Sequence, residues 1–280
     1  MLFKLPLYLL CFSLFLFNSS IEAKTTLSTS IYDKKINKSP FFDFIKKKDI
    51  KALKTIIAAG RDVNEKDEET GYTPFMTAIY YGDVRTIKLF VKAGGDLEIE
   101  DKWGNKGLHF AFLDREDRSP AVKYLLTLNP DLNSRNSNGF TPFLIAAYHD
   151  LAQSLELLIK AGVDLEQKES NEKTALYLAA ENKSPKALKL LVKKGANIEA
   201  RDKWSFTPLM AAAFENHYSM IKTLIELGAD RNACTTKDIS VSIKKIFSDF
   251  FSKTAHIPIG STALDIAKQF EKSAAIEALQ

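Results

Sequence analysis

Cysteine is almost absent from this chain of 280 residues. The sequence holds only Cys11 and Cys234, and the first lies in an apolar N-terminal segment, so an internal disulfide and a cysteine-based metal cluster are excluded. Glycine and proline are also scarce, at 12 and 9 residues, which excludes a collagen-like chain. Histidine is rarer still, and its four positions lack the His-x-x-x-His and Glu-x-x-His spacings of metal sites: His109, His149, His217 and His256.

A strong excess of charge of either sign is missing as well. Lysine and arginine number 39 against 35 aspartates and glutamates, and a net charge of +4 is too small to indicate a nucleic-acid partner. The sequence contains no Gly-x-Ser-x-Gly elbow, no phosphate-binding loop and no dinucleotide fingerprint. Cys234 has no histidine close in sequence and is interpreted as a bystander thiol. We therefore expect no catalytic residue, no cofactor and no metal.

Long apolar runs are absent except at the N-terminus. Leu5–Phe17 is an apolar run of thirteen residues between a basic start and a polar stretch, which is the layout of a secretory signal peptide. A membrane-spanning helix needs about 20 residues, so we predict a signal peptide over 1–23, cleaved after Ala23, with an uncleaved anchor as the alternative. Residues 24–38 are expected to form a flexible lead-in. The protein is then exported, periplasmic or secreted, and its lysine- and isoleucine-rich style suggests a bacterial source.

The remainder of the chain repeats with a period of 33 residues. One landmark recurs at spacings of 33, 35, 33, 33 and 55, and the last spacing equals one period plus an insertion of 22. A glycine landmark recurs in phase with it. The first landmark comprises Thr73-Pro74-Phe75, Lys106-Gly107-Leu108, Thr141-Pro142-Phe143, Thr174-Ala175-Leu176, Thr207-Pro208-Leu209 and Thr262-Ala263-Leu264, and the second Ala93-Gly94-Gly95, Ala161-Gly162-Val163, Lys194-Gly195-Ala196 and Leu227-Gly228-Ala229.

Each repeat reads as a pair of short helices. Thr141 can cap a first helix that begins at Pro142, where the missing N–H is not needed. A second helix follows, and it ends at Gly162, which can adopt the left-handed turn. One such pair buries too little apolar surface to be stable, so several pairs must stack.

These landmarks resemble the ankyrin-repeat family, whose unit carries Gly-x-Thr-Pro-Leu-His-x-Ala and a later Leu-Leu…Gly-Ala. The resemblance covers about residues 40–280 and implies an all-α solenoid of six to seven helix-pair units with adapted ends. His109 is the one position that keeps the family's histidine, and the resemblance implies that it bonds between neighbouring turns. We place the units at residues 39–67, 68–100, 101–135, 136–168, 169–201, 202–234 and 260–280.

Two segments depart from the repeat. The third unit replaces Thr-Pro with Lys106-Gly107 and gains two residues around 114–119, so we expect the least stable internal repeat there. The insertion 235–259 places apolar residues at helical spacing, which predicts a helix over 239–251. We favour packing of this helix onto the solenoid over contact with a membrane or a partner. The apolar positions are Ile239, Ile243, Ile246, Phe247, Phe250 and Phe251.

The resemblance implies a binding surface on the turns that project between units, here named the fingers, and on the ends of the first helices, here named the inner wall. Many residues at these positions are aromatic although packing does not require it, and such rings are enriched at binding hot spots. The alternative is that the rings stack on neighbouring fingers. Charged residues interrupt the run in unit five, at Lys173 and Glu181 with Asn182. The candidates are Tyr72, Trp103, Phe140, Trp204 and Phe206 on the fingers, and Tyr80, Tyr81, Leu113, Tyr148, His149, Phe214 and Glu215 on the inner wall.

The sequence therefore predicts a monomeric, exported ankyrin solenoid that binds a protein partner without catalysis. Two roles remain open within that class: a general scaffold, and a dedicated inhibitor or immunity protein directed against an exported toxic enzyme. An enzyme whose site is assembled from separate repeats is the alternative of another class.

Overall fold

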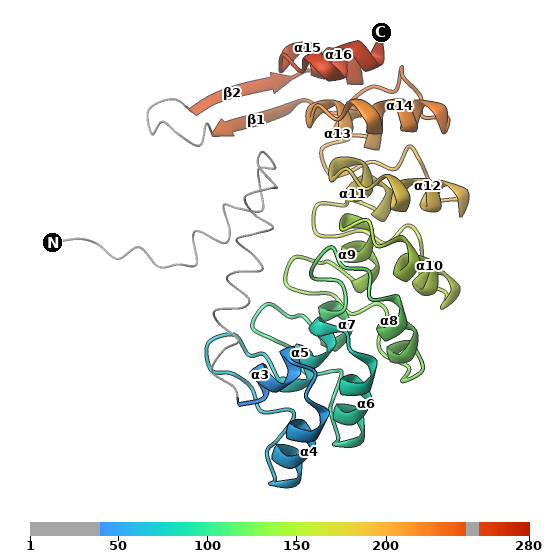
Figure 1. Ribbon diagram of the computed structural model, residues 1–280. Helices are drawn as coiled ribbons and strands as arrows, with labels where there is room; N and C mark the ends of the chain where they lie inside the picture. Colours follow the sequence, from blue (N-terminus) through green and yellow to red (C-terminus); the bar gives the residue numbers. More distant parts are fainter. Residues whose placement is uncertain (1–39, 245–251) are drawn as a thin grey trace, which may run out of the picture.

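The computed structural model describes residues 40–244 and 252–280 and shows seven stacked helix pairs (Figure 1). The expected signal peptide and lead-in lie outside the described residues. Figure 1 shows the first helices of the pairs in one layer and the second helices in the other. The first helices are α3 (Pro40–Lys46), α5 (Pro74–Tyr81), α7 (Gly107–Phe110), α9 (Pro142–Tyr148), α11 (Ala175–Glu181), α13 (Pro208–Phe214) and α15 (Ala263–Gln269). The second helices are α4 (Ile50–Ala58), α6 (Val84–Lys92), α8 (Ser119–Leu126), α10 (Ala152–Lys160), α12 (Pro185–Lys193), α14 (Tyr218–Glu226) and α16 (Ser273–Leu279).

Local signals start and stop the helices as the sequence predicts. The Thr73 hydroxyl accepts the backbone N–H of Met76 at 3.1 Å, and the next residue is a proline in the first turn of α5. Four other first helices have the same threonine cap, at Thr141, Thr174, Thr207 and Thr262. Gly162, two residues after the end of α10, adopts a left-handed backbone with φ of 91°, so the chain turns there into the next finger.

The hydrophobic core runs along the whole stack between the two layers. Phe143, Leu144, Ile145 and Ala146 follow one another in α9 and therefore point to all sides of the helix, yet all four are buried. This is because α9 contacts its own second helix, α10, and the first helices α7 and α11 of both neighbouring units. Burial of each first helix therefore requires its neighbours, as expected for a repeat array.

The third unit is built differently from the others. Its first helix, α7, has four residues, and no side chain caps its N-terminus. His109 instead bonds to the backbone on either side: its Nδ1 accepts the Lys106 N–H at 3.1 Å, and its Nε2 bonds to the Phe140 carbonyl of the next unit at 3.1 Å. The expected bonding role of His109 between turns is confirmed. The extra residues form a loop in which Arg118 pairs with both carboxylate oxygens of Asp114, at 2.5 and 2.7 Å, and lies over the Tyr80 ring.

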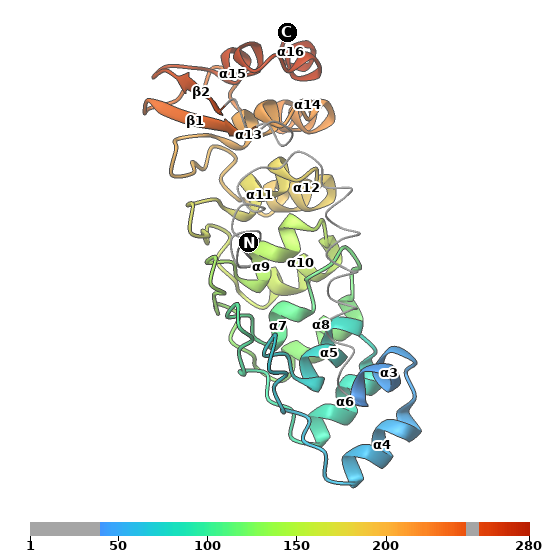
Figure 2. The same cartoon turned by 90° about the vertical axis from the view of Figure 1, so that its left-hand side faces the viewer.

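The predicted helix over 239–251 is wrong for the residues that the structure describes. Strands β1 (Ile239–Lys244) and β2 (Ser252–Ile257) form an antiparallel pair, with Ile239 opposite Ile257. Val241 completes an alternation of β-branched residues with serines, and this period of two favours a strand over a helix. The hairpin projects from the last units on the same side as the fingers (Figures 1 and 2). Ile246, Phe247, Phe250 and Phe251 lie outside the described residues. Among those that are described, no helix is long and apolar enough to span a bilayer.

Candidate functional site

In several fingers, one polar side chain accepts backbone N–H groups of the same finger and so fixes the conformation of its tip. Asp101 Oδ1 accepts the backbone N–H groups of Trp103 and Asn105, both at 2.8 Å. Asp202 holds Trp204 and Phe206 in the same way, at 3.0 and 2.8 Å. An acceptor occurs at the equivalent position in three further fingers, at Asp67, Asn136 and Glu169. The sequence analysis missed these positions, although their spacing of 33 to 35 residues is visible in the sequence.

A chain of basic side chains joins successive fingers. Arg135, Lys168 and Arg201 are spaced by 33 residues, and each donates to the backbone carbonyl one repeat further along. The donor–acceptor distances are 2.5 Å to Lys168, 3.4 Å to Arg201 and 2.8 Å to Cys234. Because each finger is braced by the one before it, the tips are held in a fixed arrangement, and a surface fixed in this way has little entropy to lose on binding.

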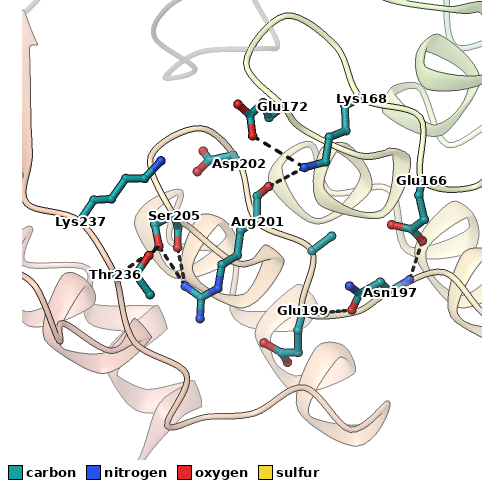
Figure 3. Close-up of a pocket in the computed structure, with 11 residues that line it drawn as sticks. Glu166, Lys168, Glu172, Asn197, Glu199, Arg201, Asp202, Ser205, Thr236 and Lys237 are labelled. Atoms are coloured by element: carbon teal, nitrogen blue, oxygen red, sulfur yellow. Dashed lines mark hydrogen bonds and ion pairs between the residues drawn. The ribbon is translucent and has the colours of Figure 1, made fainter.

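An open cavity of about 390 Å³ lies among the fingers of units five and six and the start of the insertion (Figure 3). Its polar groups already have partners. Lys168 contacts Glu172 at 3.8 Å, and Glu166 accepts the Asn197 N–H at 2.8 Å. Figure 3 shows the Arg201 guanidinium turned toward Ser205 and Thr236. We interpret this cavity as the junction between neighbouring fingers, because the charged side chains that line it already bond to groups of the fingers themselves.

Three candidate ring residues belong to the scaffold. Tyr72, Tyr80 and Phe206 are exposed by only 6%, 6% and 8%, so the expectation that they face a partner is wrong. The Tyr72 ring packs edge-on against Phe110 at 5.0 Å between centroids, and the Phe206 ring packs against Phe214 at 6.3 Å. These rings lie at the base of a finger or under the loop of the next unit, where stacking covers them. This is the alternative of ring stacking that the sequence left open.

Besides Glu215, eight candidates keep some exposure. Trp103 is the most open at 39%, and it lies at a finger tip beside the Tyr72 ring. Trp204, three units away, is half-buried beneath the Lys203 ammonium, which lies 4.2 Å from its ring centroid. The structure also adds Phe270, which the sequence analysis missed and which packs on Phe214 at 4.9 Å. The remaining half-buried candidates are Tyr81, Leu113, Phe140, Tyr148, His149 and Phe214.

The middle of the inner wall carries two glutamates, Glu181 and Glu215, and only the first has an ion-pair partner among the described residues. Glu181 pairs with Lys173 at 2.7 Å, so the interruption expected in unit five contains a closed ion pair. Asn182 is buried and donates to the Leu178 carbonyl, so it serves the helix end. Burial, followed by the negative charge of Glu181, raises the pKa of Glu215 to about 7. The same two causes raise the pKa of Tyr148.

Groups suited to catalysis do not converge in the part of the chain that the structure describes. Burial lowers the pKa values of His149 and His217 to about 4, so both rings are neutral at pH 7. The buried Nδ1 of His149 has no hydrogen-bond partner among these residues. Over 40–244 and 252–280, no three histidine, cysteine, aspartate or glutamate side chains gather as metal ligands, and Cys234 is exposed.

Comparisons with known proteins agree with this architecture. No curated protein sequence matches the chain. The structure is similar to the human ASB11 ankyrin repeat domain, with a TM-score of 0.67 and 22% identity over 86% of this chain and 98% of that one. It is also similar to the ankyrin repeat domain of Bcl-3, described as a unique member of the IkappaB family, with a TM-score of 0.61 and 20% identity over 85% of this chain and 98% of that one.

These structural likenesses show the fold. A family model described as ankyrin repeats in three copies matches residues 41–136, 108–202 and 143–235, which together cover more than half of the sequence. Ankyrin-repeat domains are in general protein-interaction modules, and their fold is typically a non-enzymatic scaffold. The landmarks at a period of 33, the stacked helix pairs and the matched residues lead to one conclusion: this chain belongs to the ankyrin-repeat family.

Proposed function

We propose that this protein is a non-enzymatic binding module that holds one protein partner against its finger tips and inner wall. The observation that carries the proposal is the placement of Trp103. Its indole is 39% exposed at the tip of a finger whose backbone is fixed by Asp101 and tied to both neighbours through Thr70 and Ser137. A large exposed ring on a rigid support has little entropy to lose on binding, and truncating a hot-spot ring costs about 2 kcal/mol or more.

The test is affinity capture from the exported fraction with the wild type and the double variant Trp103→Ala/Trp204→Ala. We expect the variant to bind the captured partner about 30-fold more weakly. Trp103→Ala alone keeps the test informative if the loss of the half-buried Trp204 disturbs folding. Tyr218→Ala is the matched control, because Tyr218 is equally exposed at 39% but lies on α14 in the other helix layer. Equal binding by the wild type and both tryptophan variants contradicts the proposal.

The captured material also distinguishes the two roles within the binding class. A single partner held tightly in a one-to-one complex supports an inhibitor or immunity protein, and many weakly held partners support a scaffold. Native mass spectrometry of the eluate measures this stoichiometry and shows whether the protein itself is a monomer. Turnover that persists in purified protein and is lost on substitution of one histidine would instead revive the enzyme alternative.

Export is the second part of the proposal. It is supported by the basic start, the apolar run of thirteen residues and the polar stretch that ends at Ala23. N-terminal sequencing of protein from the periplasmic or secreted fraction is expected to begin at Lys24. Recovery from the membrane pellet with the apolar run intact identifies an anchor, and recovery from the cytoplasm contradicts export.

A further inference from the structure

The inner wall of units four to six presents two carboxylates between aromatic rings. Tyr148 ends α9, Glu181 ends α11 and Glu215 follows the last residue of α13, so the three occupy nearly equivalent positions of successive repeats. All three are half-buried. The Phe214 ring, also half-buried, lies next to Glu215 in the sequence and packs on Phe270 in the last unit.

The two carboxylates differ in how they are neutralised. Glu181 has the ammonium of Lys173 at 2.7 Å. The Glu215 carboxylate, in contrast, has no hydrogen bond and no ion pair with any residue that the structure describes. The nearest cations act on it only at longer range: Lys173, Lys183 and Lys272.

Covering Glu215 with a partner removes the water that still solvates its carboxylate. Against an apolar or neutral surface this desolvation is unfavourable, because the carboxylate would either be buried without a counter-charge or have to take up a proton. A cationic side chain placed opposite the carboxylate compensates the loss. The ring faces nearby suit the alkyl stem and the charged head of such a side chain, as the Lys272 ammonium 5.7 Å from the Phe214 centroid illustrates within the protein itself.

We infer that the inner wall between Tyr148 and Phe214 is a subsite for one arginine or lysine side chain of the protein partner, with the Glu215 carboxylate as its counter-charge. This inference rests on the proposed binding function and specifies its chemistry. The partner must then present a basic residue beside apolar ones. Arginine fits best, because a guanidinium is planar, stacks on rings and is less strongly hydrated than an ammonium.

The subsite also makes binding depend on pH. With its pKa at about 7, Glu215 is mostly protonated at pH 6 and mostly ionised at pH 8. A cationic ligand binds the ionised form, so its affinity is expected to be roughly tenfold higher at pH 8 than at pH 6. Of the groups that act on Glu215, Glu181 keeps its pKa high, whereas Lys272, Lys173 and Lys183 lower it. His217, beyond α13, is neutral over this range because its pKa is about 4.

The experiment is an NMR titration of the isotope-labelled protein with n-butylguanidinium chloride, followed at the amide signals of Phe214 and Glu215. We expect saturable shifts at pH 8, roughly tenfold weaker binding at pH 6, and at least tenfold weaker binding without pH dependence in Glu215→Gln. N-butylurea, the neutral analogue, is expected to leave these signals unchanged at the same concentration and ionic strength. Glu226→Gln, on the exposed end of α14 in the same unit, is the control variant and should bind like the wild type.

Two results overturn the inference. Equal shifts with the neutral analogue would identify an apolar subsite, and undiminished binding of n-butylguanidinium to Glu215→Gln would place the cation elsewhere. Either result leaves the proposed function intact, because that function is tested by Trp103→Ala and partner capture. Conversely, capture that is equal for the wild type and both tryptophan variants contradicts the proposed function even where the probe binds as expected, so the two failures are distinguishable.

Discussion

Glutamate 215 is expected to destabilise the folded protein at alkaline pH, and Glu215→Gln is expected to relieve this. Its side chain is half-buried, lacks a hydrogen-bond partner among the described residues and lies near the like charge of Glu181. Glutamine keeps the size of the side chain and removes the charge. The variant should therefore be more stable than the wild type wherever Glu215 is ionised in the folded state.

The pKa gives the size and the pH range of this effect. A pKa of about 7 in the folded protein, against the ordinary 4.5 in the unfolded chain, means that the folded state binds the proton more tightly. Wild-type stability therefore falls as pH rises from about 4.5 to 7. At about 1.36 kcal/mol per pH unit, the full loss is about 3 kcal/mol at pH 8, and at pH 5 it is about 1 kcal/mol or less.

Urea denaturation followed by circular dichroism measures the difference. At pH 8 the midpoint of Glu215→Gln should lie about 1 M or more above that of the wild type, for a slope of about 1–3 kcal/mol per M. At pH 5 the two midpoints should differ by only about a quarter as much. Glu226→Gln removes an exposed glutamate of the same unit and should change stability by no more than about 0.5 kcal/mol at either pH. The reasoning fails if Glu215→Gln is no more stable than the wild type at pH 8.

Three further predictions concern the third and fourth units. His109→Leu leaves the Lys106 N–H without its acceptor and removes one hydrogen bond from the Phe140 carbonyl, which keeps the one from the Asn136 N–H. The variant should lower the free energy of unfolding by about 2 kcal/mol in urea titrations, and a loss under about 0.5 kcal/mol would contradict the bonding role. His149→Phe should match or exceed the wild type by about 1 kcal/mol at pH 7, because the buried Nδ1 has no partner within the described chain. Wild-type stability should also fall as pH drops from 6.5 to 4, where the unfolded state binds the His149 proton more tightly, and thermal scans of His149→Phe should show a smaller fall. Amide exchange should be fastest around α7 among the internal repeats, given its four residues and missing side-chain cap, and uniform protection across the units would refute this.

The helix pairs and their stacking could be predicted from the sequence because their signals are local. A threonine followed by proline begins a first helix at Thr73, Thr141 and Thr207, since the hydroxyl accepts an N–H three residues ahead whatever the rest of the chain does. A left-handed turn at Gly162 similarly depends on one residue. The period of 33 then requires every unit to pack in the same way, which gives the solenoid without any knowledge of the core.

The insertion shows where such patterns become ambiguous. Ile239 and Ile243 are four residues apart, a spacing that satisfies both the helical period of 3.6 and the strand period of two. Val241 decides between them, and pairing with Ser252–Ile257 supplies the hydrogen bonds that a lone strand lacks. That pairing partner is known only once the chain has folded.

The candidate site depended on tertiary structure to a larger extent. The sequence placed rings on the fingers and the inner wall, but it could not tell that these rings differ in burial. Tyr72 and Tyr80 are covered by the next unit and Phe206 packs on Phe214, while Trp103 stays exposed. Exposure depends on residues of other units, and so does the charge state of Glu215. Its pKa is raised first by burial and then by the charge of Glu181, while Lys272 lowers it. Local hydrogen bonds and turns depend on residues close in the sequence and can therefore be predicted from it. Burial and electrostatic interactions act through space, so they are determined only when the repeats stack.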